Sequence, residues 1–170
     1  KLDCSNNKIK SFESLPLNLK YLNCIKNQIE NLNNLPDSLE KIYCSNNNIT
    51  HISNLPKNLV ELKCGYNQII SIENSNENIK SICCRNNKIE LLDNLPKNLE
   101  LLNCNSNKIV SLNNLPNKLK RLHCQNNNLT NLDNLPRGLL ILDCGENQIN
   151  ARKQSLRPSE NLSGVISACL

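Results

Sequence analysis

The sequence predicts a nearly helix-free solenoid with a parallel β-sheet of short strands along one side and an extended or polyproline-like return path. Three observations carry this prediction. The chain repeats every 20 residues, in seven full copies and a partial eighth. Each copy follows the pattern LxCxxNxIxxLxNLPxxLxx, which is typical of a stacked repeat architecture. Aromatic residues make up only 2% of the 170 residues, so Leu, Ile and Cys must build the core.

The strand is predicted at the LxC element of each copy. Side chains alternate along an extended chain, so Leu22 and Cys24 face inward while Asn23 faces outward. The next copy repeats this arrangement with Ile42 and Cys44. Stacking such strands about 4.8 Å apart gives a parallel sheet with an apolar column and a cysteine column on its inner side.

An asparagine follows each cysteine of this column by three residues. A polar residue between a buried Cys and a buried Ile should turn inward, where its amide pairs with backbone groups of its own and neighbouring turns. The column consists of Asn7, Asn27, Asn47, Asn67, Asn87, Asn107, Asn127 and Asn147.

A Leu-Pro pair marks the return path of most copies. Proline disfavours a helix interior and keeps the preceding residue extended, and 20 residues leave too little chain for a full helix. The fourth copy has Asn74, Ser75 and Asn76 at this point, which predicts a looser outer wall there. The pairs begin at Leu15, Leu35, Leu55, Leu95, Leu115 and Leu135.

The period divides the chain into a solenoid over residues 1–150 and a segment over residues 151–170. Arg152 stands where a core leucine is due, so the second segment is expected to be a degenerate ninth turn that caps the core, or else a tail. The chain begins at Lys1 in mid-repeat without an initiator Met, which is expected of a piece of something longer.

The cysteine column predicts buried, reduced thiols that act as small apolar residues in a reducing compartment. A regular ladder suits neither disulfide geometry nor a converging set of metal ligands, so we expect no metal and no cofactor. Cys83 faces outward, but His123 lies two copies away in the same column and His51 lies on the outer side. A catalytic Cys-His pair is therefore not expected.

Charge and motifs exclude several function classes. The net charge of +5 is spread among mixed Lys and Glu positions, so nucleic-acid binding is not favoured. No apolar run is long enough to cross a bilayer. No phosphate-binding loop, HExxH or GxSxG motif occurs, and we expect no enzyme activity of the chain itself.

The segment LxxLxCxxNxI, from Leu19 to Ile29, resembles the leucine-rich-repeat signature, with Cys at the second strand Leu. The short repeats with Leu-Pro are similar to those of bacterial type III effectors. The Asn, Lys and Ile bias with a cysteine column is similar to repeat proteins of amoeba-infecting giant viruses. The resemblance implies the α/β leucine-rich-repeat horseshoe class and a right-handed, curved solenoid. It also implies that the sheet lies on the concave face, the usual partner surface.

The outward strand positions hold the candidate partner-binding residues. Tyrosine and arginine are enriched among interface residues that contribute most to binding, although tyrosine also simply suits strands. Tyr21, Tyr43 and Tyr66 lie at these positions or just after them. The other candidates are Ile25, Lys63, Arg85, Arg121 and His123.

Three functions fit these features. The first is a non-catalytic module that binds a partner protein, such as a host protein, through the concave face in the cytoplasm. The second is the recognition arm of a larger enzyme, such as a ubiquitin ligase. The third is a structural or virion protein.

Overall fold

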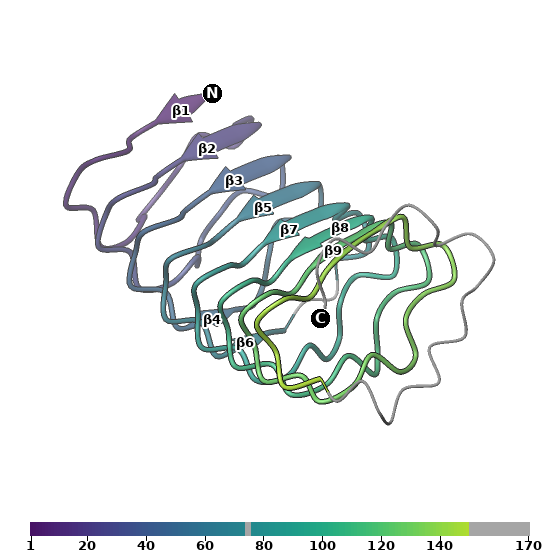
Figure 1. Ribbon diagram of the computed structural model, residues 1–170. Helices are drawn as coiled ribbons and strands as arrows, with labels where there is room; N and C mark the ends of the chain where they lie inside the picture. The colour runs from purple at the N-terminus through teal and green to yellow at the C-terminus, as the bar shows by residue number, and fades with distance from the viewer. Residues whose placement is uncertain (74–75, 150–170) are drawn as a thin grey trace.

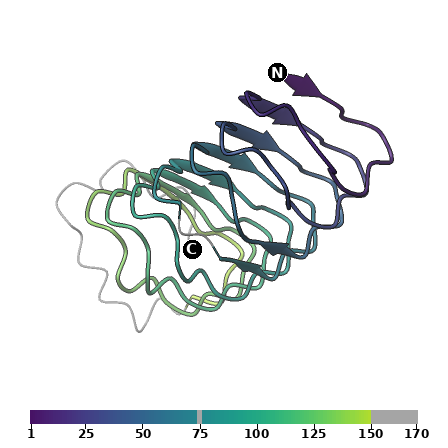
Figure 2. The same ribbon diagram turned by 180° about the vertical axis from the view of Figure 1, so that it is seen from behind.

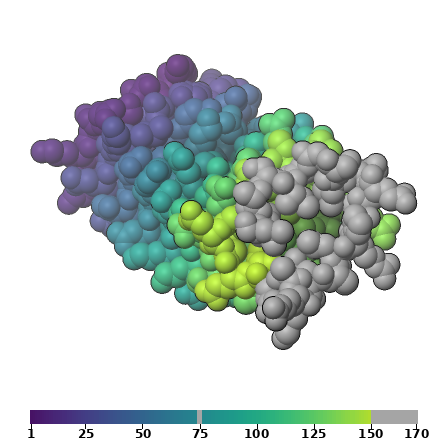
Figure 3. All heavy atoms as spheres, in the orientation of Figure 1, coloured from purple at the N-terminus to yellow at the C-terminus, as the bar shows by residue number. Residues whose placement is uncertain are grey.

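The computed structural model describes residues 1–73 and 76–149. This part of the chain is a solenoid whose turns stack in register from the N-terminal turn onward (Figure 1), and the opposite view shows the same stack (Figure 2). No helix occurs in the part of the chain described. In the space-filling view the described residues form one continuous body that begins at the N-terminal turn (Figure 3). The prediction of a nearly helix-free leucine-rich-repeat solenoid is confirmed.

One parallel sheet of eight strands lines the concave face, in the order β1-β2-β3-β5-β7-β8-β9-β10. Every partner lies 20 residues along the chain, as in Leu22 opposite Ile42 and Ile42 opposite Leu62. The bounds are β1 Leu2–Asp3, β2 Tyr21–Asn23, β3 Lys41–Tyr43, β5 Glu61–Lys63, β7 Ser81–Cys83, β8 Leu101–Asn103, β9 Arg121–His123 and β10 Ile141–Asp143.

The predicted inner columns form the core. Leu22 and Cys24 are both fully buried, as are Ile42 and Cys44 in the next turn. Ile29 belongs to the second apolar column, which packs against the first from the far side of the turn. Because each turn covers the apolar side chains of the next, the core is one continuous stack.

The side chains of the asparagine column form hydrogen bonds with the backbone at the corner after each strand, as predicted. The side-chain amide of Asn47 donates to the carbonyl oxygens of Cys24 and Cys44, each at 3.0 Å. Its oxygen accepts from the amide of Ile29 at 2.9 Å. Asn47 therefore links its own turn to the one before it and leaves none of these buried backbone groups unpaired.

The corner itself requires a left-handed residue two positions after each column cysteine. Asn46 has φ of 58°, and Tyr66 has φ of 55° at the equivalent place. Asparagine tolerates this conformation and tyrosine does not favour it. Asn6, Lys26, Asn86, Ser106, Asn126 and Glu146 share the same left-handed region.

The convex wall, formed by the return path of each turn, changes direction at a left-handed asparagine just before the Leu-Pro pair, such as Asn34 with φ of 59°, and turns again just after the pair. The carbonyl of Pro36 accepts from the amide of Leu39 at 3.1 Å, closing a turn that does not need the N–H that proline lacks. The wall also contains a two-stranded parallel sheet that the sequence did not predict. It pairs β4 (His51–Ile52) with β6 (Ser71–Ile72).

Two predictions fall wholly or partly outside the described residues. The cap or tail over residues 151–170 lies there entirely, and so does its boundary at residue 150. Asn74 and Ser75, at the copy without Leu-Pro, lie there as well. Asn76 is described, and its side-chain amide donates to the carbonyl of Pro56 at 2.6 Å.

Candidate functional site

Two of the predicted tyrosines meet on the concave face. Tyr21 begins β2 and Tyr43 ends β3, so both side chains point away from the core on neighbouring strands. Their ring centroids are 5.2 Å apart at an interplanar angle of 76°. Edge-to-face contact is a favourable geometry for two aromatic rings, so each ring restrains the other.

A lysine lies against each of these rings. The Lys63 ammonium is 4.2 Å from the centroid of Tyr43, and the Lys1 ammonium is 5.0 Å from the centroid of Tyr21. Contacts of this kind contribute roughly 0.5–1 kcal/mol at exposed sites. We call Lys1, Tyr21, Tyr43, Lys63 and Glu61 the aromatic cluster.

Glu61 connects the cluster through its carboxylate. It accepts from the Tyr43 hydroxyl at 3.1 Å and forms ion pairs with Lys41 and Lys63, each at 3.1 Å. Partial burial alone would raise the pKa of this carboxyl. Hydrogen bonds from Lys41, Lys63 and Tyr43 outweigh that effect, so the pKa of Glu61 is lowered and the group stays ionised at neutral pH.

The third predicted tyrosine forms a separate pair. The Arg85 guanidinium carbon lies 5.1 Å from the centroid of the Tyr66 ring, which follows β5 and is 45% exposed. Gly65, just before Tyr66, leaves room for the Arg85 side chain to cross the chain at this point. Tyr66 and Arg85 therefore form a second surface pair. It lies one strand further along the sheet than the aromatic cluster.

The remaining candidates lie apart from these groups or are partly covered. Ile25 is half-buried beside the aromatic cluster, and its amide donates to the side chain of Asn23 at 3.3 Å. Arg121 is exposed at the start of β9. His123 ends that strand, and its ring is hydrogen-bonded to the Asp143 carboxylate. The eight predicted residues thus form two groups and a separate C-terminal stretch, not one patch.

Sequence reasoning missed the residues that hold the tyrosines. Lys1, Lys41 and Glu61 share one outward column with Tyr21, and Asp143 shares another with His123. Comparing each outward residue with those about 20 positions away would have found these charged neighbours. Their exact contacts run diagonally, as between Tyr43 and Glu61, which are 18 residues apart.

Most of the cysteines behave as predicted. Eight described cysteines are free, and Cys83 is half-buried at its outward position. Burial raises the pKa of the Cys24 and Cys124 thiols to about 12, so both remain protonated at neutral pH. One part of the prediction is wrong: Cys144, at the C-terminal end of the column, is disulfide-bonded.

The described residues contain neither a metal-binding cluster nor a helix that could span a membrane. Within residues 1–73 and 76–149, no group of three or more His, Cys, Asp or Glu side chains could hold a metal ion. No helix in these ranges is long and apolar enough to cross a bilayer. His123 contacts the Asp143 carboxylate on the neighbouring strand.

Comparison with solved structures finds the same fold in bacterial proteins. The leucine-rich-repeat domain of a Shigella effector is 22% identical, with a TM-score of 0.79 over 89% of this chain and 70% of that one. YopM from Yersinia enterocolitica is 30% identical, with a TM-score of 0.66 over 86% and 37%. An internalin from Listeria monocytogenes is 28% identical, with a TM-score of 0.68 over 89% and 48%.

The likeness lies in the repeat domain. The chain spans 70% of the Shigella domain but only 37% of YopM and 48% of the internalin. Neither the family models nor the curated proteins compared with this sequence include a match.

Proposed function

We propose that this short-repeat leucine-rich-repeat solenoid, which resembles the repeat domains of bacterial type III effectors, binds a partner protein through its concave face. The aromatic cluster is the observation that supports this most directly. It places two tyrosines in edge contact, each under a lysine, on the outward side of adjacent strands.

Such a cluster suits binding because its side chains are already ordered. Tyr43 is held by Tyr21, Lys63 and Glu61 before any partner arrives, so little side-chain entropy remains to be lost on contact. Tyrosine also offers apolar area together with a hydroxyl, a combination that interfaces favour. The Tyr66 and Arg85 pair extends this surface by one strand.

The remaining candidates enter the proposal as the edges of the same face. Ile25 would add apolar contact beside the cluster, and Arg121 with His123 would contact a larger partner further along the sheet. Partners that reach only the first five turns would leave Arg121 and His123 free.

The test begins with capture of partners from host-cell lysate on the immobilised protein, identified by mass spectrometry. A captured protein is then purified and titrated against Tyr43→Ala and Tyr66→Ala. Removing a ring at the centre of an interface should weaken binding by about 2 kcal/mol, or roughly thirtyfold. Tyr43→Phe keeps the ring but removes the bond to Glu61, so it should weaken binding less.

The matched control is Leu17→Ala, which removes an apolar side chain that is 82% exposed. It should leave the affinity unchanged, and all variants should keep the parental thermal midpoint within a few degrees. Equal affinity of the parent, Tyr43→Ala and Tyr66→Ala for every purified partner would exclude the concave face as the binding surface.

The proposed location is a reducing compartment, such as the cytoplasm of a host cell. The free column cysteines support it, while disulfide-bonded Cys144 is the exception. Two other functions remain predictions from the sequence: the recognition arm of a larger enzyme such as a ubiquitin ligase, and a structural or virion protein. Western blotting of fractionated infected cells, with virions as one fraction, distinguishes these locations.

A further inference from the structure

The rim of the solenoid from which the strands start changes its charge along the stack. In each turn this rim is a five-residue segment that ends on the first strand residue, from 17–21 at β2 to 137–141 at β10. The first four segments contain four cations and four carboxylates, so their formal charges cancel. The last three contain five cations and one carboxylate, which leaves four positive charges in excess. These cations are Lys97, Lys118, Lys120, Arg121 and Arg137, and the carboxylate is Glu100.

Ion pairs neutralise the N-terminal part of this rim. Three of the four cations there lie against a carboxylate of a neighbouring turn, so each has an anionic partner within the protein. An external anion would have to compete with these carboxylates. The pairs join Lys20 to Glu40 at 2.8 Å, Lys41 to Glu61 at 3.1 Å and Lys57 to Asp37 at 3.2 Å.

The C-terminal part of the rim has one carboxylate for several lysines. Glu100 forms an ion pair with the Lys120 ammonium at 2.8 Å. The pKa of this carboxyl is lowered chiefly by the hydrogen bond from Lys120, and the charges of Lys80 and Lys118 add to the effect. Because the single carboxylate is shared in this way, most of the positive charge of these turns remains uncompensated.

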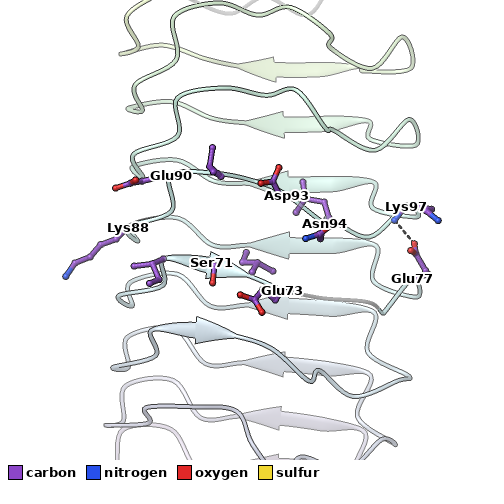
Figure 4. A pocket seen from close by; sticks show the side chains of 12 residues that line it. Ser71, Glu73, Glu77, Lys88, Glu90, Asp93, Asn94 and Lys97 are labelled. Atoms are coloured by element: carbon purple, nitrogen blue, oxygen red, sulfur yellow. Dashed lines mark hydrogen bonds between the residues drawn. The ribbon is translucent and has the colours of Figure 1, made fainter.

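The other cations of this part lie next to neutral groups or solvent. The Lys118 ammonium donates to the amide oxygen of an asparagine side chain at 2.6 Å. Lys97 reaches the Glu77 carboxylate through its backbone amide rather than its ammonium, as the dashed line in Figure 4 shows. Arg121 and Arg137 are exposed, and neither forms an ion pair with a carboxylate of residues 1–73 or 76–149.

Two exposed aliphatic side chains lie beside these cations. Leu140 is 58% exposed and Ile141 is 39% exposed. The amide of Leu140 donates to the carbonyl of Lys120 at 2.7 Å, and Ile141 lies opposite Arg121 in the sheet. Each aliphatic residue therefore lies next to a cation of the preceding turn. We call Lys118, Lys120, Arg121, Arg137, Leu140 and Ile141 the basic rim.

We propose that the basic rim binds the surface of a membrane that contains anionic lipids, without crossing it. The ammonium and guanidinium groups lie against the lipid headgroups, and Leu140 and Ile141 enter the boundary between headgroups and acyl chains. Each cation near an anionic leaflet contributes about 1 kcal/mol, so four cations and two aliphatic side chains together support reversible attachment. This function is additional to binding through the concave face and does not depend on it.

The position and composition of the basic rim favour a membrane over other anionic partners. Lys118, Lys120 and Arg137 precede the strands, so they lie at the edge of the solenoid, where a flat surface reaches them without entering the concave face. Single-stranded nucleic acid binds by stacking its bases on aromatic rings, and the chain has no aromatic residue after Tyr66. Charge alone would serve an acidic protein segment, whereas the exposed aliphatic side chains add the apolar area that a lipid boundary takes up.

The probe is a vesicle of phosphatidylcholine with about 30% phosphatidylserine, and co-sedimentation measures the bound fraction of the intact protein. A vesicle of pure phosphatidylcholine keeps the lipid boundary but removes its negative charge. The proposal expects binding to the first vesicle at about 0.1 M salt and at least about tenfold weaker binding to the second. Raising the salt to about 1 M should release most of the bound protein, because charges are then screened beyond about 3 Å.

Lys118→Glu combined with Arg137→Glu should weaken binding to the anionic vesicle by at least about tenfold, because two attractions become repulsions. The matched control is Lys88→Glu combined with Lys108→Glu, which changes the net charge by the same amount in the fifth and sixth turns. These lysines belong to the opposite rim, and Figure 4 shows Lys88 on the other side of the turns from Lys97. The control pair should weaken binding by less than about threefold.

Leu140→Ser tests the apolar contribution and should weaken vesicle binding by about fivefold, since a largely exposed leucine no longer leaves water on binding. Leu17→Ser is its control, because Leu17 is 82% exposed on the same rim in the first turn, where cations are not in excess. It should leave binding unchanged. Thermal unfolding of each variant checks that the solenoid is intact.

Three results would each overturn the proposal: no binding of the parent protein to the anionic vesicle, equal weakening by the control pair of lysine variants, or unchanged binding of Leu140→Ser. A fluorescein-labelled oligoglutamate peptide is followed in parallel by fluorescence anisotropy. Binding of this peptide without binding of vesicles would assign the basic rim to an acidic protein instead. Tyr43→Ala leaves the basic rim intact, so it should bind vesicles as the parent does, and a loss of binding would contradict the proposed location.

Discussion

Arg85 crosses directly over Gly65. A Cβ atom at Gly65 would stand 3.1 Å from the Arg85 Cγ and 3.1 Å from the Arg85 carbonyl oxygen. The same carbonyl accepts from the amide of Tyr66 at 2.9 Å, so it cannot easily move. The small residue at position 65 is thus what lets Arg85 lie on the Tyr66 ring.

Gly65→Ala should destabilise the protein by about 1 kcal/mol, because the added methyl group meets backbone as well as a side chain. It should also weaken the binding of a concave-face partner, because it moves Arg85 away from Tyr66. Urea unfolding and partner titration measure the two effects. Gly138→Ala is the control: its Cβ would meet only a carbonyl at 3.8 Å, so it should be neutral or slightly stabilising. Equal unfolding midpoints for both variants would contradict this.

Asn47→Ala should cost about 2–3 kcal/mol of unfolding free energy. The change leaves the buried amide of Ile29 without its partner in the next turn. It also removes one of the two asparagine donors from each of the carbonyls of Cys24 and Cys44, which keep Asn27 and Asn67. Asn7→Ala is the matched control at the exposed first turn, where it should cost under about 1 kcal/mol. Urea titration monitored by circular dichroism measures both, and similar losses for the two variants would refute the linking role.

Tyr66→Asn should stabilise the fold by about 0.5–1 kcal/mol while weakening partner binding. Asparagine accepts the left-handed backbone that tyrosine adopts here at a cost. Tyr66→Ala removes the ring but keeps a Cβ in that conformation, so it should weaken binding without the stabilisation. Thermal melts and partner titrations of the three proteins separate the effects. A less stable Tyr66→Asn would show that the contact with Arg85 outweighs the backbone cost.

The buried thiols should make the protein sensitive to alkali. Burial raises their pKa above the usual value near 9.0, to about 12 for Cys24 and Cys124. Unfolded thiols ionise above about pH 9 while folded ones keep their protons, so stability is full below that pH and falls as pH rises. Above that pH, each buried thiol lowers the free energy of unfolding by up to about 1.4 kcal/mol per pH unit. The pKa is raised in the same direction for Cys44, Cys64, Cys84 and Cys104.

Urea midpoints measured between about pH 8 and pH 10 should therefore fall steeply at the upper end. Cys44→Ala removes one titrating group and should make the fall less steep, whatever its own cost at neutral pH. Cys83→Ala is the control because Cys83 is only half-buried on the outward side. A flat profile for the parent protein over this range would rule out protonated core thiols as a source of stability.

The 20-residue period alone assigns each side chain to the core, a corner or the surface. Leu22, Cys24 and Asn47 follow this assignment because identical backbone geometry recurs in every turn, and burial strongly favours one side for each residue type. The outward placement of Tyr21 and Tyr43 follows in the same way.

Contacts between surface side chains could only be seen in the tertiary structure. Tyr43 contacts Tyr21, Lys63 and Glu61 through rotamers and diagonal neighbours, and each such contact contributes only about 1 kcal/mol or less. A pattern of columns does not choose among contacts so close in energy. The pairing of β4 with β6 was likewise visible only in the tertiary structure.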